Sequence, residues 1–434
     1  MLRCGNGSGQ VAAAGREKGH GTCSRGLFHL PPPRASCDTG RVKRPRLPRT
    51  VWVLGFVSLL MDLSSETIHA LLPLFITVTL AAPVTILGAI DGISEATASF
   101  AKLAAGRLSD RSRRRKPWIL WGYGLAAATK PLFALAGSPL TVLGARLVDR
   151  TAKGLRGAPR DAMIADETPP EIRGAAFGLR QGLDTVGAFL APIAAVALMW
   201  AFADDIRAVF WVAVIPALLS VALAWLALRE PTRHAAGAAL QPVLAGFRLV
   251  SPATRRLIAV GFLFTLARFS ESFLILKGVD AGLSLATAPL VLVVFNFAYL
   301  ALGYPAGALS DRLDPRLILI GGIAMLVAGN LVLARTDDFA GLTVGVLLWG
   351  GHMALTQGLF ARMIADAAPP DLRATSFGLF HFATGIATFL ASLAAGLLWD
   401  RIGPQATFTA SAAVAAMAAL MLLSLPGTDE PRPD

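Results

Sequence analysis

Acidic and imidazole side chains occur inside an otherwise apolar run near the start of this sequence, where each is costly to bury unless it binds a partner. Asp62, Glu66 and His69 all lie in the run 51–72. At 3.6 residues per helical turn they fall within about a 60° arc, so one helix face would carry all three. Groups on such a face can bind and release protons or contact a polar solute. The alternative interpretation is a set of buried ion pairs that hold helices together.

Two further apolar runs carry charged faces. Asp91 and Glu95 lie about one helical turn apart in the second run. In the fourth run, Arg146, Asp149 and Arg150 fall within roughly 100° of each other on a mainly basic face. A fixed cation beside a carboxylate stabilises its charged form, so protonation becomes coupled to movement of either partner. These residues are therefore candidates for proton coupling and for lining a solute cavity.

The elements that must position these side chains are long apolar helices. Hydrophobic residues make up 54% of the sequence and charged residues 16%, below the ~25% usual in soluble domains. Twelve runs of about 20 mostly apolar residues are each long enough to cross the ~30 Å hydrocarbon core of a bilayer. We therefore predict an all-α integral membrane protein with twelve transmembrane helices. The predicted spans are 51–72, 84–104, 118–136, 139–158, 175–200, 208–228, 257–277, 285–305, 316–334, 341–361, 375–397 and 405–424.

An internal repeat divides these twelve runs into two sets of six. The segments 163–179 and 363–379 share ten identical residues in seventeen positions, 200 residues apart. A second match, Gly106 with 108–111, recurs as Gly307 with 309–312 at an offset of 201. Two matches at nearly one offset indicate a duplicated chain. The fold class follows as two pseudo-symmetric six-helix bundles, with a central linker between them.

The repeat places a second set of charges opposite the first. Arg268 and Glu271, in the seventh run, fall close to where Asp62 and Glu66 fall in the first run. Pseudo-symmetry would bring these two helices face to face across a central cavity. The hypothesis is that Asp62 or Glu66 meets Arg268.

The two halves differ in charge at equivalent positions. At an offset of 200, the helix-4 residues Arg146 and Arg150 become Val346 and Gly350. The second half is therefore nearly neutral where the first is basic. We expect ion coupling to depend on the first half, and the second half to contribute shape and polar contacts to the solute.

The segment 106–116 resembles the loop between helices 2 and 3 of the major facilitator superfamily, which has the form G-x-L-x-D-R-x-G-R-[RK]. Arg113 stands where that family has its second Gly. The resemblance implies a cytoplasmic loop whose Asp and Arg groups latch the two halves together. The implied gate consists of Gly106, Asp110, Arg111, Arg114 and Arg115, with Gly307, Asp311 and Arg312 as the copies in the second half.

Two weaker resemblances bear on mechanism. Arg150 with Gly154 resembles the helix-4 motif R-x-x-x-G, whose Arg is implicated in proton transfer. The segment 187–192 is similar to the G-x-x-x-G-P element of drug/proton antiporters, with Ala191 in place of the second Gly. Asp184, one turn earlier, is a further candidate site residue. Together they favour an antiporter, although small residues here also allow close helix packing.

Charge placement predicts the orientation. Residues 1–50 hold ten Lys/Arg against two acidic residues, which supplies +8 of the net charge of +12. Lys and Arg are absent near 81–84 and 137–139. By the positive-inside rule both termini are expected in the cytoplasm, at the inner or plasma membrane. The tail is expected to be disordered, with a transit peptide as the alternative, and its three cysteines to be free thiols.

The expected organisation is a basic tail, two bundles, a linker and a short C-terminal tail: 1–50, 51–229, 230–256, 257–425 and 426–434. The predicted function is secondary active transport, as proton-coupled efflux of a small molecule by a monomer. Proton-coupled uptake of a small, even anionic, solute is an alternative, as is a non-transporting sensor or assembly protein. We expect no enzyme activity, cofactor, metal or nucleic acid, and without a G-x-x-x-x-G-K-[ST] loop ATP is not the energy source.

Overall fold

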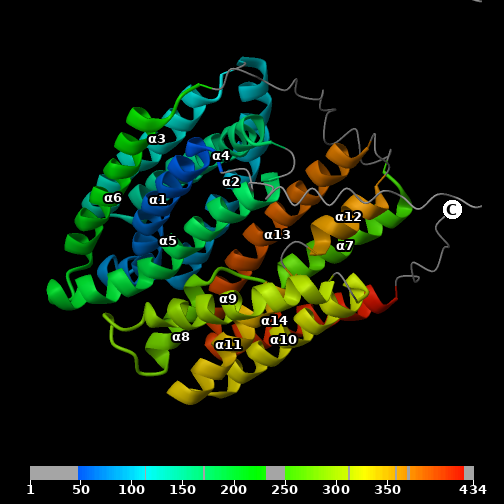
Figure 1. The fold of residues 1–434 in the computed structure, drawn as a ribbon. Helices are drawn as coiled ribbons and strands as arrows, with labels where there is room; N and C mark the ends of the chain where they lie inside the picture. The colour runs from blue at the N-terminus through cyan, green and yellow to red at the C-terminus, as the bar shows by residue number, and fades with distance from the viewer. Residues whose placement is uncertain are drawn as a thin grey trace, which may run out of the picture. The chain divides into compact units, whose positions relative to one another are not determined.

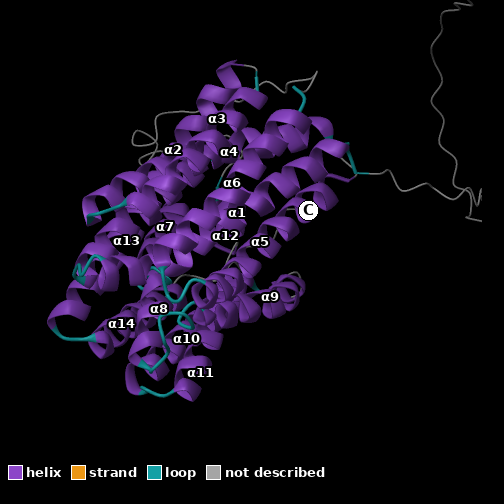
Figure 2. Ribbon diagram, turned by 90° about the vertical axis from the view of Figure 1, so that its left-hand side faces the viewer, coloured by secondary structure: helices purple, strands orange, loops and turns teal. Residues whose placement is uncertain are grey.

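The computed structural model describes residues 47–424, except 113, 170–171, 231–249, 311–312, 357–358 and 369–371. The backbone alone is described at 102–112, 158, 304, 307–310, 361–362, 365–366 and 373–375. Throughout these residues the chain forms helices joined by short loops, with no strand (Figure 2).

The first half of the chain contains helices α1 to α6 (Figure 1). Local sequence explains where several of them begin. The Ser138 hydroxyl accepts from the backbone N–H of Thr141 and Pro139 follows it, which starts α4, while Asp205 caps α6 in the same way. The helices are α1 (Arg49–Leu74), continued by the π-helical turn η1 (Phe75–Thr79), α2 (Val84–Ser112), α3 (Lys116–Leu135), α4 (Pro139–Glu167), α5 (Arg173–Ala201) and α6 (Ile206–Ala227).

The second half repeats this order with one clear interruption. The run 257–277, predicted as one helix, is two helices separated by non-helical backbone at 267–271. Four polar residues, Arg268, Ser270, Glu271 and Ser272, fall in or beside this break. The helices are α7 (Pro252–Leu266), α8 (Ser272–Asp280), α9 (Leu290–Ser310), α10 (Pro315–Arg335), α11 (Phe339–Thr356), α12 (Leu359–Ala367), α13 (Arg373–Arg401) and α14 (Pro404–Leu423).

Many of these helices suit a bilayer. Seven in the described part are long and apolar enough to cross a membrane: Arg49–Thr79, Arg173–Ala201, Ile206–Ala227, Pro315–Arg335, Phe339–Thr356, Ser376–Arg401 and Pro404–Leu423. The charges inside α4 lower its hydropathy, and the break leaves α7 and α8 short. Large apolar side chains point outward, including Trp121, Trp225 and Leu226, as expected of a surface that faces lipid.

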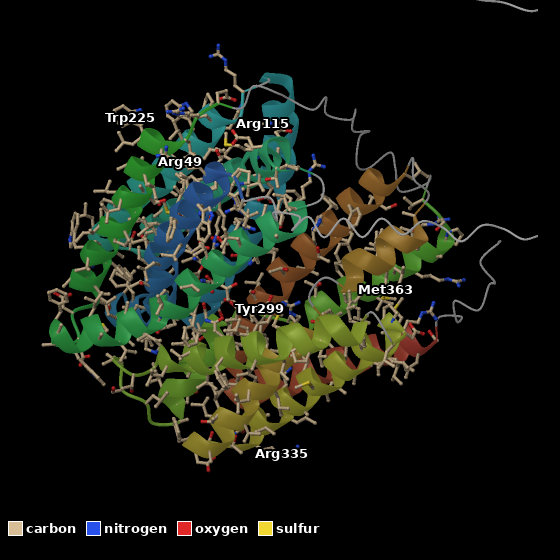
Figure 3. The ribbon with its side chains drawn as sticks, in the orientation of Figure 1. Arg49, Arg115, Trp225, Tyr299, Arg335 and Met363 are labelled. Atoms are coloured by element: carbon tan, nitrogen blue, oxygen red, sulfur yellow. The ribbon has the colours of Figure 1, made fainter. Side chains whose placement is uncertain are left out.

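Figure 3 labels side chains at several helix ends. Arg49, Arg115 and Trp225 lie at the same end of the first half, where α1 and α3 begin and α6 finishes. Glu230, just beyond α6, accepts hydrogen bonds from the backbone N–H groups of Arg115 (2.5 Å) and Lys116 (3.0 Å). This carboxylate caps the start of α3 and ties it to the end of the first half.

At the other end, away from Arg49 and Arg115, the two halves share one hydrophobic core. Leu71 and Ile76 of the first half belong to the same buried cluster as Ile275 and Leu276 of the second. Two other large clusters each stay within one half. Apolar burial therefore joins the halves at the end where α2 begins.

Helices α2 and α13 form the most extensive contact between the halves, side by side over much of their length (Figure 1). At Gly88 a side chain would collide with the backbone carbonyl of Ser392, so glycine is required for this approach. Asp400 of α13 accepts from the backbone N–H groups of Val84 (3.0 Å) and Thr85 (2.7 Å). The second half thus caps a helix of the first.

Candidate functional site

A cavity of about 670 Å³ lies between the two halves. The first half contributes Glu66, His69, Asp91, Glu95, Ser99, Arg146, Arg150 and Lys153. The second half contributes Phe264, Thr265, Arg268, Phe269, Ser270, Glu271, Thr356, Phe360, Phe380, His381, Thr384, Gly385, Thr388 and Ser392. Eight of the ten side chains that the sequence marked as cavity candidates line it; Asp62 and Asp149 do not.

Asp91 is the point where polar groups of both halves meet. Its side chain is 2% exposed, and its Oδ1 accepts from Arg146 Nη2 of its own half at 2.5 Å. Its Oδ2 accepts from the hydroxyls of Ser270 (2.7 Å) and Ser272 (2.6 Å) of the second half. The break between α7 and α8 presents both hydroxyls to the carboxylate. Asp91 therefore holds an ion pair within one half and two hydrogen bonds across the interface.

His69 connects Arg146, the partner of Asp91, to Glu66. Its Nε2 lies 3.2 Å from Arg146 Nη2, and its Nδ1 lies 3.2 Å from Glu66 Oε2. Arginine has only donors, so Nε2 must accept and the ring proton must be on Nδ1, donated to Glu66. The two contacts therefore define the tautomer of His69. A continuous chain of hydrogen bonds thus runs from Glu66 to Asp91.

Arg150 and Lys153 continue the charged wall of the first half. Arg150 Nη2 pairs with Glu95 Oε1 at 3.2 Å, and the Glu95 side chain is 44% exposed. Lys153 is exposed and acts electrostatically on Glu66 and Glu95. The basic face of α4 that the sequence marked is therefore largely paired with carboxylates of α2.

Asp149 occupies a different place from the one predicted. It pairs with Lys130 Nζ of α3 at 2.7 Å, and Lys130, 1% exposed, also donates to Ser65 Oγ at 2.9 Å. The 100° arc on α4 is wide enough that Asp149 turns to α3 while Arg146 and Arg150 face the cavity. Lys130 was missed from the sequence, although a single Lys inside the apolar run 118–136 was a usable signal.

Asp62 also turns away from the cavity. It lies beside Asp184 of α5, close enough for their carboxyl groups to interact. Asp184 in turn accepts from Arg180 at 2.8 Å and lies 3.9 Å from Arg160. Of the three α1 residues in the predicted 60° arc, Glu66 and His69 face the cavity, whereas Asp62 faces α5.

Arg268 does not meet Asp62 or Glu66, contrary to the hypothesis. Its Nη2 lies 2.7 Å from the Met353 sulfur, and its guanidinium sits 5.6 Å from the centre of the Phe264 ring. The break in the helix explains the difference, because a one-to-one superposition with α1 requires a continuous helix. Arg268 and Glu271 still face the cavity, from non-helical backbone.

An aromatic surface adjoins Arg268. The Phe264 and Phe360 rings lie 5.5 Å apart, and the Phe360 and Phe380 rings stack at 5.9 Å. All three line the cavity. The wall from the second half is therefore aromatic and hydroxyl-rich, whereas the wall from the first half is charged.

The predicted gate is described only in part. Gly106, Asp110, Arg111 and Gly307 are described by their backbone alone, and Asp311 and Arg312 lie outside the described residues. Arg114 and Arg115 are described, and Arg115 Nε lies 3.5 Å from Asp166 Oδ2 at the end of α4. Within the described part, no group of three or more His, Cys, Asp or Glu residues is arranged to hold a metal ion.

Comparisons with known proteins agree with this architecture. The MFS-type transporter MJ1317 of Methanocaldococcus jannaschii is 28% identical over 383 residues, 87% of this chain and 95% of the relative. The protein Rv2265 of Mycobacterium tuberculosis is 26% identical over 396 residues, 88% of this chain and 95% of the relative. Both matches span nearly the whole of the relative.

Solved structures show the same fold at low sequence identity. The nucleoside transporter NupG matches with a TM-score of 0.73 at 14% identity, covering 86% of this chain and 99% of that one. The human organic anion transporter MFSD10 (TETRAN) matches with a TM-score of 0.63 at 19% identity, covering 87% and 100%. The family model of the Major Facilitator Superfamily matches residues 54–288 and 257–434. This chain belongs to the Major Facilitator Superfamily and is a multi-pass membrane transporter.

Proposed function

We propose that this chain exports a small solute in exchange for protons, and that Asp91 couples proton binding to the movement of the two halves. Secondary transporters of this fold alternate access by rocking one bundle against the other around a central site. The observation that carries the proposal is the double engagement of Asp91, with Arg146 in its own half and with two serines of the other.

A proton on Asp91 would weaken both sets of contacts. The ionised carboxylate accepts two hydroxyl hydrogen bonds on one oxygen and a charged one on the other, and bonds to charged groups are the stronger class. Neutralising Asp91 weakens the bonds from Ser270 and Ser272, which join the halves, and releases Arg146 from its counter-charge. Protonation therefore favours separation of the halves near the closed end, the end where α2 begins and apolar burial joins the halves.

A chain of hydrogen bonds from Glu66 through His69 ends at Arg146, which cannot carry a proton but donates to both His69 and Asp91. Glu66 and His69 line the cavity, and the accepting Nε2 of His69 faces the same guanidinium that holds Asp91. A proton that reaches Nε2 ends the hydrogen bond from Arg146 to His69, because both groups are then donors. Protonation of His69 and the pairing of Asp91 are therefore linked through one side chain, Arg146.

Exchange, rather than co-transport, is the direction we propose. Its support is the similarity of the segment 187–192 to the antiporter element. The alternative of anion uptake was based on the basic face of α4. That face is paired with Asp91 and Glu95, so it gives uptake no specific support.

The same proposal includes the orientation and the functional unit. Basic residues concentrate in the tail, at 113–116 and in the central linker, which supports cytoplasmic termini at the inner or plasma membrane. The cavity takes its lining from both halves of one chain, so a monomer has a complete site.

Proton movement in liposomes tests the proposal. Purified protein would be challenged with cationic drugs, sugars and organic anions while an internal dye reports pH. We expect wild type to admit protons as a solute leaves, and Asp91→Asn to lose at least about tenfold of that coupled flux, since hydrogen bonds to charged groups are the stronger class. Asp338→Asn, which alters an exposed loop carboxylate, is the matched control and should keep the flux.

The result also separates the alternatives. Protons that leave the same compartment together with the solute would indicate co-transport. The absence of flux with every solute would favour a sensor or assembly protein. Unchanged coupling in Asp91→Asn would show that the assignment of Asp91 is wrong.

A further inference from the structure

We propose that the solute carries an anionic group, a carboxylate or a phosphate, on a flat apolar body, and that Arg268 binds that group. The inference rests on the proposed transport function, because it names the class of solute that the same cavity takes. It comes from a comparison of the cations that line or adjoin the cavity.

The buried cations that line the cavity from the first half are already neutralised by neighbouring carboxylates. Arg146 pairs with Asp91 and Arg150 with Glu95, while Lys130 pairs with Asp149 behind the cavity wall. Lys153 forms no ion pair among the described residues, but its side chain is exposed, so solvent already screens its charge. A solute anion would have to displace one of these carboxylates from its partner.

Arg268 has no such partner among the described residues. Its Nη2 donates to the Met353 sulfur at 2.7 Å, its Nε has no hydrogen-bond acceptor, and it lies over the Phe264 ring. A thioether is a weak acceptor, and an aromatic face compensates a cation only in part. Glu271 acts on Arg268 electrostatically but forms no ion pair with it, and also lines a small side pocket with Asn296.

An unpaired guanidinium in such a place selects for an anion. Burying a charge is costly unless it is paired and hydrogen-bonded, so a ligand that supplies the missing acceptors is stabilised most. The planar fork of arginine matches the two oxygens of a carboxylate or phosphate. The break at 267–271 removes Arg268 from the helix surface, which directs its fork into the space between the halves.

The rest of the solute follows from the surfaces beside Arg268. Phe264, Phe360 and Phe380 form a contiguous aromatic wall of the cavity, with ring centres 5.5 and 5.9 Å apart. Flat apolar groups pack well on such rings. The cavity volume of about 670 Å³ lies within the range of sites for small organic molecules. An anionic group on a planar ring system satisfies both surfaces at once.

A series of probes that share one ring system tests the inference by binding alone. Naphthoate, naphthyl phosphate, naphthamide and naphthylmethylammonium would be titrated into the full-length protein in detergent by isothermal calorimetry. We expect naphthoate or naphthyl phosphate to bind at least about tenfold more tightly than naphthamide, and the ammonium most weakly. The anion that binds more tightly shows whether Arg268 prefers a carboxylate or a phosphate.

Variants assign the preference to Arg268. Arg268→Gln should bring the anion to the affinity of naphthamide, and Arg268→Lys should keep part of the difference because it keeps the charge but not the fork. Arg256→Gln removes an exposed Arg from α7, the helix that precedes the break, and should leave all four affinities unchanged.

Equal affinity for the anions and the amide would overturn the inference, and so would a preference that survives Arg268→Gln. Failure of every probe to bind wild type would count against it as well. The readout requires no proton movement, so its failure is distinguishable from that of the proposed function. If Asp91→Asn loses the coupled flux but the wild type shows no anion preference, the proposal of proton coupling stands. Only the proposed class of solute would then be wrong.

Discussion

Two buried contacts at equivalent positions show how the halves differ. In the first half Lys130 of α3 pairs with Asp149 of α4 at 2.7 Å. Two hundred residues later the same positions are Asn330 of α10 and Trp349 of α11, joined by a neutral hydrogen bond at 3.0 Å. Each contact recruits a serine hydroxyl, from Ser65 and Ser411 respectively. The equivalent helix pairs are therefore joined by an ion pair in the first half (α3 with α4) and by an amide hydrogen bond in the second (α10 with α11).

The lesson is that this fold does not need buried charges to pack. The second half joins α10 to α11 with polar but neutral groups, and Gly350, where the first half has Arg150, packs against the carbonyl of Phe295. Charges in the first half must therefore be explained by what they do. Asp91, Glu95 and Arg146 face the cavity, in agreement with a role in coupling.

The largest effect is expected when one charge of the buried Lys130–Asp149 pair is removed. Lys130→Met leaves the Asp149 carboxylate buried without its partner, which typically costs about 3–5 kcal/mol of stability. We expect a large fall in the thermal unfolding midpoint, followed by tryptophan fluorescence in detergent. The double variant Lys130→Met/Asp149→Leu should recover most of the loss. A single variant as stable as wild type would show that the pair contributes nothing to folding.

The equivalent change in the second half should cost less. Asn330→Leu removes a neutral contact and leaves the Trp349 N–H and the Ser411 hydroxyl to find other partners, a cost of about 1–3 kcal/mol. The same fluorescence measurement, made side by side with Lys130→Met, gives the ratio of the two effects. A loss as large as that of Lys130→Met would remove the distinction between the charged and neutral halves.

The smallest effect is expected where one half caps the other. Asp400→Ala deletes the carboxylate that caps α2, which is worth about 1 kcal/mol for a typical cap. Because this contact exists only while the closed end is packed, the change should increase the population in which that end is open. Spin labels at Gly137 and Asp338, with the tail cysteines replaced by serine, would report this opening as additional long distances between the labels. Asp204→Asn, in a loop of the first half where the backbone is left-handed and Asn is tolerated, serves as the control.

The sequence predicted the fold well because the fold depends on long-range patterns. Apolar run length gave the membrane helices, and the repeat gave the two bundles. Helix rotation was the weak point, since an arc of 60° to 100° on one helix faces more than one neighbour. Asp62 and Asp149 were assigned to the cavity for that reason, and each turned to an adjacent helix instead.

The break at 267–271 and the role of Lys130 needed different information. Arg268, Ser270, Glu271 and Ser272 interrupt an apolar run, and that density of polar residues was a signal for a break that length alone obscured. Lys130 required its partner to be known, because a lone Lys in an apolar helix has no predictable direction. Pairing across helices is a tertiary property, and neither periodicity nor composition encodes it.

The packed contact between α2 and α13 has an electrical consequence. When the cavity is filled with electrolyte it conducts, so a membrane potential falls mainly across the packed layer between Asp91 and Asp400. A unit charge that crosses the full potential gains about 2.3 kcal/mol per 100 mV. Steps that move charge through this layer would be strongly voltage-dependent, while binding at Arg268, on the conducting side, would be nearly independent of voltage.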